Sequence, residues 1–177
     1  MRRDRGGEAV RIRSARPEDA PAVLDLIRDV AATTEFLAQV GADAIPDPTL
    51  VAAQITAFER HPLHLALVAE ADGSLVGSLR FTPGAATRNR HTGSFFVQVR
   101  STWRGRGVGR ALIESLLAWA RAHPSIEKVS LGVFATNAAA IGLYRSLGFV
   151  EEGRAVREFR LGPGRYVDDV KMYVWVK

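Results

Sequence analysis

Three glycines at alternate positions join a predicted strand to a predicted helix in the middle of the chain. Residues 104–110 read Arg-Gly-Arg-Gly-Val-Gly-Arg; they follow the apolar run 94–99 and precede a helical apolar stripe that ends before Pro124. Glycines permit backbone dihedrals that other residues avoid, and they leave backbone N–H groups uncovered. A helix start adds unpaired donors and a positive dipole. The sequence therefore predicts a turn that can bind a pyrophosphate.

Two familiar phosphate-binding loops do not fit this turn. A Walker loop ends in Gly-Lys-Ser/Thr, which is absent here. A dinucleotide fingerprint needs G-x-G-x-x-G after the first strand and an acidic residue about 20 positions on. Here the spacing is G-x-G-x-G, and the turn follows the fourth predicted strand.

The periodicity on both sides of the turn predicts a mixed α/β domain with a partly antiparallel sheet. Helices are expected from Pro17, from Asp47-Pro48, over 108–120 and over 137–147. Strands are expected at 10–13, 63–70, 75–81, 94–99, 128–134, 150–161 and 166–176. Residues 9–177 are predicted to form one domain, and residues 1–8 a disordered tail.

Charge and composition narrow the function classes. The 177 residues contain no cysteine, which excludes disulfides, thiolate metal sites and a cysteine nucleophile. The four histidines lack the spacing of metal ligands, so no metal is expected. No apolar run approaches the ~20 residues of a membrane span, and the basic N-terminus lacks the apolar run of a secretory signal. We expect a cytoplasmic protein without a membrane partner.

The basic residues are concentrated around the glycine turn. The net charge is +5, and between Asp72 and Glu114 seven arginines occur without an acidic residue. This pattern indicates a polyanionic partner, either nucleic acid or a phosphate-rich cofactor. The sequence carries no recognised nucleic-acid motif, so we expect no nucleic acid.

The glycine turn resembles the acyl-coenzyme A motif of the GNAT N-acetyltransferase superfamily, Gln/Arg-x-x-Gly-x-Gly/Ala. Arg104, Gly107 and Gly109 match its three fixed positions. A second match follows at the family's usual distance, with Asn137, an apolar helix, Tyr144, and then Ser-Leu-Gly-Phe at 146–149. The resemblance spans roughly residues 9–177. It implies the GNAT fold, a mostly antiparallel sheet of about seven strands flanked by four helices.

The resemblance also implies acetyl-CoA as co-substrate and a set of residues that bind it. The splayed fourth strand of the family offers backbone N–H groups to the pantetheine arm and the oxyanion. The implied cofactor-binding residues are Val97, Gln98, Val99, Arg104, Gly105, Arg106, Gly107, Val108, Gly109, Arg110, Asn137 and Tyr144. The alternative role of Asn137 is that of N-cap of its helix.

Acetyl transfer to an amine needs a base, an oxyanion site and an acid for the departing thiolate. The resemblance assigns the acid to Tyr144, which is protonated at neutral pH. Many family members carry a glutamate on the fourth strand at the position of Gly93, and the run 92–99 has no carboxylate. Glu35 is the catalytic candidate for the base or for holding the ammonium, and His91 is a second candidate.

The opening of the domain resembles the branch of the family that acts on amino acids, their analogues or other small amines. We expect a small-molecule primary amine as acceptor, attacked directly within a ternary complex; Arg88 and Arg90 would favour one with a carboxylate. A ribosomal-protein-type N-terminal acetyltransferase and a non-catalytic acyl-CoA-binding domain stay open as alternatives. A homodimer is a further implication of the resemblance.

Overall fold

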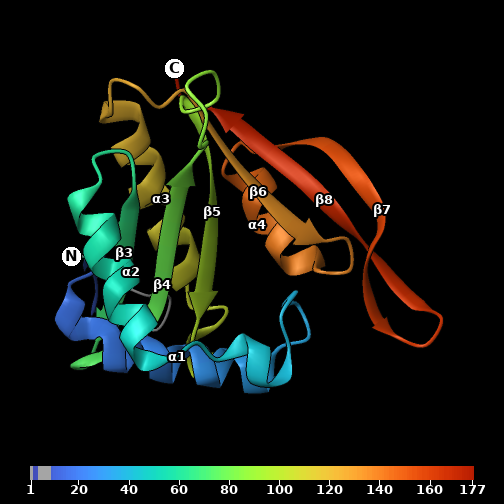
Figure 1. Cartoon of the computed structure of the whole chain (residues 1–177), viewed down its shortest axis with the longest axis horizontal. Helices are drawn as coiled ribbons and strands as arrows, with labels where there is room; N and C mark the ends of the chain where they lie inside the picture. Colours follow the sequence, from blue (N-terminus) through green and yellow to red (C-terminus); the bar gives the residue numbers. More distant parts are fainter. Residues whose placement is uncertain (1, 4–8) are drawn as a thin grey trace.

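The computed structural model describes residues 2–3 and 9–177, and its centre is one eight-stranded sheet (Figure 1). The strands lie in the order β1-β2-β3-β4-β5-β6-β8-β7, and every neighbouring pair is antiparallel except β5 and β6. The strands are β1 (Arg2–Arg3), β2 (Ala9–Ser14), β3 (Leu65–Ala71), β4 (Ser74–Pro83), β5 (Thr92–Val99), β6 (Lys128–Phe134), β7 (Val150–Gly162) and β8 (Arg165–Trp175).

Four α-helices cover the two faces of this sheet. They are α1 (Ala20–Thr33), α2 (Pro48–Arg60), α3 (Val108–Ala122) and α4 (Ala138–Ser146). The side chain of Asp47 accepts a hydrogen bond from the Thr49 N–H and caps α2, which has proline at its first position. A 3-10 turn at Pro17–Asp19 precedes α1, so the first α-helix begins three residues after the predicted start.

Each face of the sheet has its own apolar core. The apolar stripe of α3 packs on one face, against alternate residues of β3 and β4 that include Leu79 and Phe81. On the other face, α1 and α2 close a smaller cluster around Val68. Because successive side chains of a strand point to opposite faces, β3 and β4 contribute to both clusters. We refer to the second face as the α1/α2 face.

The sheet divides between β5 and β6. These two strands pair only where both begin, at Thr92–Ser94 and Lys128–Ser130, and diverge beyond that point (Figure 1). The second half of β5 therefore has β4 on one side and no strand on the other. The β7–β8 hairpin continues the sheet on the far side of β6.

The fold confirms the predicted architecture, including four α-helices and a mostly antiparallel sheet. Arg2–Arg3, within the predicted tail, pairs with Ala9–Val10 as the short strand β1. The rest of that predicted tail, residues 1 and 4–8, lies outside the described residues. In the described part of the chain, no helix is both long and apolar enough to cross a membrane.

Candidate active site

The glycine turn adopts the unusual backbone that its sequence predicts. Gly105 has φ 74° and Gly107 has φ 94°, both in the left-handed region that favours glycine. Gly107 is the N-cap of α3, so the helix begins inside the turn. A Cβ added to either glycine would meet no atom within 4 Å, so the space over the turn is open. The first N–H groups of α3 have no partner within the helix and lie beside this space.

Two arginines of the turn are held by neighbouring elements. The guanidinium of Arg104 donates to the carbonyl and hydroxyl oxygens of Thr33, at 2.9 and 2.8 Å, and to the Val99 carbonyl oxygen. Arg110 donates to the Ser146 hydroxyl at 2.6 Å, which ties the start of α3 to α4. The Arg104 side chain thus fixes the turn against α1, while its backbone stays part of the predicted phosphate cradle.

The third arginine packs on an aromatic ring. The Arg106 guanidinium lies 4.1 Å from the centre of the Trp103 ring, a cation–π contact that braces the turn. The remaining residues of the predicted cradle contribute backbone: Val108 is buried, and Gly109 approaches the Val99 and Leu143 side chains. The small size of Gly109 lets α3 and α4 pack close to the end of β5.

The C-terminal half of α1 is pinned to the start of the same turn. Ser101 donates from its N–H and its hydroxyl to the Asp29 carboxylate, at 2.7 and 2.9 Å. Desolvation raises the pKa of the Asp29 carboxyl, but the two hydrogen bonds from Ser101 outweigh it and hold this pKa below its ordinary value. Arg100 also pairs with Asp25 at 2.6 Å, in an exposed position.

The free edge of β5 carries unpaired backbone groups. Gly93 accepts from the Ser130 hydroxyl on the β6 side, whereas Arg100 donates its N–H to Val76 on the β4 side. Because backbone groups of successive strand residues point to opposite sides, Val97 and Val99 direct theirs away from β4. Pairing with β6 ends at Ser94, so no strand among the described residues pairs with the Val97 and Val99 N–H groups.

Gln98 lies in the same stretch and points elsewhere. Its backbone faces β4, where it pairs in register with Ser78. Its side chain is buried on the α1/α2 face and donates to the Ser78 hydroxyl at 2.9 Å. We call the space between the second half of β5 and β6 the gap. The backbone N–H groups of Val97 and Val99 face this gap, whereas the side chain of Gln98, the third β5 residue predicted to bind the cofactor, faces a cavity described below.

Tyr144 approaches the gap from the opposite face of the sheet. Its ring packs edge-on to Phe95 of β5, with centroids 6.0 Å apart, and also contacts Phe149. Burial raises the pKa of Tyr144 to about 12. Its hydroxyl makes no hydrogen bond to the described part of the chain, so it can donate to a ligand.

Asn137 is the N-cap of α4. Its side-chain oxygen accepts from the Ala140 N–H at 3.2 Å, the second of the two roles expected from the sequence. The amide nitrogen of the same side chain is not used by the cap. Asn137 can therefore cap the helix and still donate to a ligand in the gap.

Position 93 cannot hold the side chain of a catalytic base in this fold. A Cβ built on Gly93 would lie 2.2 Å from Cζ of Phe81, which is fully buried in the α3-side core. A side chain here would point into that core and away from the α1/α2 face. The glycine is thus a packing requirement, because the Phe81 ring occupies the space of its missing side chain.

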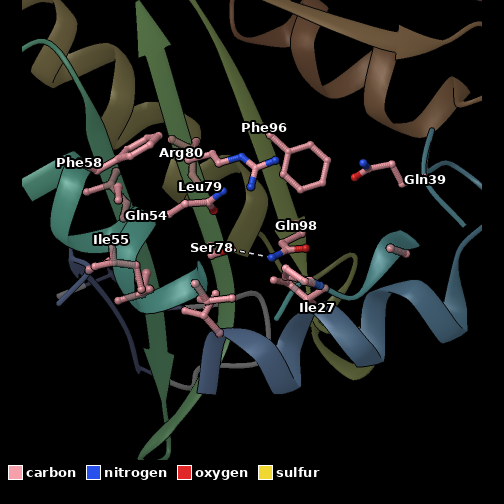
Figure 2. Close-up of a pocket in the computed structure, with 18 of the residues that line it drawn as sticks. Ile27, Gln39, Gln54, Ile55, Phe58, Ser78, Leu79, Arg80, Phe96 and Gln98 are labelled. Atoms are coloured by element: carbon pink, nitrogen blue, oxygen red, sulfur yellow. Dashed lines mark hydrogen bonds between the residues drawn. The ribbon is translucent and has the colours of Figure 1, made fainter. Parts of the chain in front are cut away.

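A cavity of about 580 Å³ lies on the α1/α2 face, between α1, the segment 37–46, α2 and the strands β3–β5. Figure 2 shows Arg80, Gln54, Ser78 and Gln98 among the polar side chains around it. Phe96 and Gln98 line it from β5, the strand whose second half borders the gap on the β6 side. The cavity and the gap therefore meet at β5.

Several residues expected at the acceptor site lie outside this cavity. Glu35 is exposed and does not line it, and Arg88 and Arg90 are exposed in the β4–β5 loop. His91 holds the start of β6, since its carbonyl oxygen accepts from the N–H groups of Glu127 and Lys128.

Two residues that do line the cavity, Asp43 and Arg80, were not assigned a role from the sequence. Arg80 lies in the arginine-rich stretch and alternates with buried Leu79 and Phe81, a pattern that could have placed it on the opposite face. Asp43 had no comparable signal, because the segment around it follows no period.

The arginine-rich stretch does not form one basic surface. Its members are divided among the cavity (Arg80), the exposed loop, the contact with α1 and the turn. Among residues 2–3 and 9–177, no three histidine or carboxylate side chains are grouped closely enough to hold a metal ion.

Comparison with known proteins identifies the class. The model of the acetyltransferase (GNAT) family matches residues 30–149, well over half of the chain. The chain therefore belongs to the GNAT acetyltransferase family.

Two curated relatives show the range of acceptors in related proteins. The chain is 35% identical over 102 residues to the L-amino acid N-acetyltransferase AaaT of Escherichia coli, covering 58% of this chain and 62% of the relative. It is 36% identical over 80 residues to the spermidine N(1)-acetyltransferase of Vibrio cholerae, covering 45% of this chain and 46% of the relative. The matches thus span about half to three fifths of these relatives' lengths.

Solved structures resemble the chain over nearly its whole length. A GNAT-family acetyltransferase from Streptococcus pneumoniae has a TM-score of 0.90 at 25% identity, covering 96% of this chain and all of that one. The protein yncA from Salmonella typhimurium, solved with its cofactor acetyl-CoA, has a TM-score of 0.84 at 25% identity, covering 96% and 95%. Acetyl-CoA is thus a ligand of a closely similar fold.

Proposed function

We propose that this protein is an acetyl-CoA-dependent N-acetyltransferase that acetylates the primary amine of a small molecule. The acceptors considered are an amino acid, an amino-acid analogue or a polyamine. The observation that carries the proposal is the free edge of β5, with unpaired N–H groups at Val97 and Val99. The glycine turn lies at one end of this edge, Tyr144 on one face and the cavity on the other.

The residues around the gap fit acetyl-CoA. The open glycine turn and the first N–H groups of α3 suit a pyrophosphate. Arg106 and Arg110 add positive charge, and the strand-like edge at Val97 and Val99 suits the amide-bearing pantetheine arm. Bound there, acetyl-CoA supplies an activated thioester carbonyl.

In the proposed reaction the acceptor nitrogen attacks that carbonyl carbon directly, and the carbon–sulfur bond breaks. A backbone N–H at the β5 edge donates to the oxygen as negative charge develops on it. Tyr144 gives its hydroxyl proton to the departing thiolate, and the proton that the acetylated nitrogen then loses restores the Tyr144 hydroxyl. The high pKa of Tyr144 keeps its proton in place at neutral pH until that step.

The ammonium of the acceptor must lose a proton before it can attack. We propose that water carries this proton to a carboxylate of the segment between α1 and α2. Glu35 is the residue expected from the sequence, and Asp43 is the carboxylate of that segment that lines the cavity. We expect Asp43→Asn to lower kcat/KM more than Glu35→Gln; equal values for both variants would count against a base in this segment.

The test is thiol release from acetyl-CoA with a panel of amino acids, polyamines, aminoglycosides and short peptides. The wild type is compared with Tyr144→Phe, and acetyl-CoA binding is measured for both by calorimetry. We expect turnover with one class of small amine, greatly reduced in the variant while binding persists. Binding without turnover would support a non-catalytic domain, turnover confined to peptides would support a protein N-terminal acetyltransferase, and no binding would refute the proposal.

The proposal includes a cytoplasmic protein that forms a homodimer and needs no metal. Sedimentation velocity measures the oligomeric state. Chelation tests whether turnover needs a metal. We expect that it does not, because every proposed step uses backbone and side-chain groups of the chain. Turnover should be unchanged after dialysis against EDTA, and loss of activity that zinc or magnesium restores would contradict it.

A further inference from the structure

Arg80 and the carboxylate Asp43 both line the cavity on the α1/α2 face, and no ion pair joins them within the described residues. Arg80 on β4 lies opposite Phe96 on β5, and its guanidinium stands 5.0 Å from the centre of the Phe96 ring. Figure 2 shows the guanidinium directed into the cavity beside that ring. Within the described part of the chain, Arg80 forms no ion pair.

Two other arginines near the sheet form ion pairs. Arg13 pairs with Asp19 and Glu70 at 2.7 Å, and Arg100 pairs with Asp25. Arg80 is exposed at the mouth of the cavity, but the protein around its guanidinium partly desolvates it, which lowers the pKa of that group. A ligand that supplies an anion to this partly desolvated cation would form a charge-assisted hydrogen bond with it.

The neighbours of Arg80 suit a compact polar anion. Ser78 precedes it by two residues on the same face of β4, and the side chains of Gln54 and Gln98 line the same cavity. The planar guanidinium can donate two parallel hydrogen bonds to a carboxylate, and hydroxyl and amide groups can satisfy further lone pairs.

The wall that α1 and α2 form is apolar apart from Gln54. Its apolar residues are Val23 and Ile27 of α1 and Val51, Ile55 and Phe58 of α2. A ligand with a carboxylate at Arg80 would therefore place an aliphatic or aromatic side chain against these helices. The volume of about 580 Å³ falls in the range of ~300–1,000 Å³ typical of small-ligand pockets.

We propose that Arg80 is a specificity residue that binds the free carboxylate of the acceptor, and that the acceptor is an α-amino acid with an apolar side chain. This inference rests on the proposed function and narrows it. A polyamine brings only positive charge to the arginine, and a peptide N-terminus has an amide in place of the nearby carboxylate. Neither should be a good acceptor.

The first test needs only the wild type and matched acceptors. Leucine is compared with leucinamide, isoamylamine and spermidine, with acetyl-CoA saturating. We expect kcat/KM for leucine to exceed that for leucinamide and isoamylamine by about 10- to 100-fold, the range for a hydrogen-bonded charge pair. Equal values for leucine and leucinamide, or a preference for spermidine, would overturn the inference and leave the acetyltransferase proposal intact.

The second test assigns the discrimination to Arg80. Arg80→Met keeps the length and apolar stem of the side chain and removes the charge, while Arg80→Lys keeps the charge and loses the two-pronged geometry. We expect Arg80→Met to raise KM for leucine about 10- to 100-fold without changing KM for leucinamide or acetyl-CoA, and Arg80→Lys to fall between. The control is Arg28→Met, which removes the same charge from an exposed position of α1. An equal effect of Arg80→Met on both acceptors would contradict the role.

If no acceptor is turned over, the proposed function fails, and calorimetry still tests the cavity. Leucine binding to the wild type with coenzyme A present, lost in Arg80→Met and kept in Arg28→Met, would support the carboxylate site. Absence of leucine binding would overturn it.

Discussion

At the scale of single residues, Tyr144 has the chemistry that the proposed reaction needs from an acid. Its ring is fixed by Phe95 and Phe149, and its hydroxyl has no competing partner in the described chain. Replacing it with phenylalanine removes one oxygen and leaves the packing. We expect kcat to fall about 100-fold or more, in the range of a general acid, while the dissociation constant of acetyl-CoA changes little.

The raised pKa of Tyr144 makes a prediction about pH. Because burial raises this pKa to about 12, the hydroxyl stays protonated below that value. Stopped assays from pH 6 to 10 should therefore show no loss of kcat with a midpoint near 10, the ordinary value for tyrosine. An alkaline loss near pH 10 that disappears in Tyr144→Phe would contradict the burial of this group.

Gly93 and Ser94 provide a matched test of where a carboxylate can be placed on β5. A side chain at 93 would collide with Phe81, so Gly93→Glu should destabilise the fold by about 3 kcal/mol or more, at the upper end of overpacking costs. Ser94 is exposed, so Ser94→Glu should change stability by less than about 0.5 kcal/mol. Urea unfolding measures both. Equal stabilities for the two variants would refute this reading of Gly93.

The sequence predicted the site residues unevenly, for a physical reason. The conformation of a turn depends on neighbouring residues, so the glycine turn and the helix start at 107–108 could be predicted from the local sequence. The cavity on the α1/α2 face is assembled from several elements, including α1, α2, β4 and β5, and no local pattern shows that Arg80 and Gln54 line it together. Arg104 matched its motif, yet its side chain holds Thr33, a contact across 71 positions.

At the scale of elements, α1 and the glycine turn form a unit through Asp29. This carboxylate accepts two hydrogen bonds from Ser101 in a half-buried position, whereas the Asp25–Arg100 pair is exposed. We expect Asp29→Ala to raise the dissociation constant of acetyl-CoA about 10-fold, since hydrogen bonds to charged groups contribute ~1.5–3 kcal/mol. Asp25→Ala is the control and should change it less than 3-fold, as for exposed ion pairs. Calorimetry distinguishes them, and equal effects would contradict the anchoring role.

The unpaired edge of β5 makes a prediction for hydrogen exchange. The amides of Val97 and Val99 have no strand partner, while those of Phe96 and Gln98 face β4. In the free protein, Val97 and Val99 should exchange faster than their neighbours, and acetyl-CoA should slow them selectively. NMR exchange rates report each amide separately. Slow exchange at Val97 and Val99 without ligand would contradict the open edge.

At the scale of the whole molecule, one ion cluster ties the first strand of the domain to its neighbours. Arg13 on β2 donates to Asp19 before α1 and to Glu70 on β3. Hydrogen bonds from Arg13 lower the pKa of both carboxyls. Their stabilising effect is complete above the unfolded pKa values near ~4 and is lost as pH falls through the lower folded values.

Removing Arg13 should therefore change how stability depends on pH. We expect the free energy of unfolding of the wild type to fall more steeply below pH 4 than that of Arg13→Met, with the two curves parallel above pH 5. Urea unfolding across pH 3 to 7 gives both curves. Parallel curves over the whole range would show that the cluster does not couple folding to pH.

The overall fold was predictable because most elements carry their own signal. Alternating apolar residues defined the strands, and proline with acidic residues defined the helix starts at 17–19 and 47–48. The segment 34–46 was not predictable, since it lacks a period and takes its path from packing over the cavity. The pairing of Arg2–Arg3 with β2 was also missed, because two residues are too few to show alternation.

The central claim is that one acetyl group passes from acetyl-CoA to an acceptor amine held at β5. The most direct measurement follows thiol release and the mass of the acceptor in the same reaction, with leucine as acceptor. We predict one acetylated leucine for each free thiol, with both products lost together in Tyr144→Phe. Thiol release without acetylated acceptor, or no turnover when both ligands bind, would contradict it.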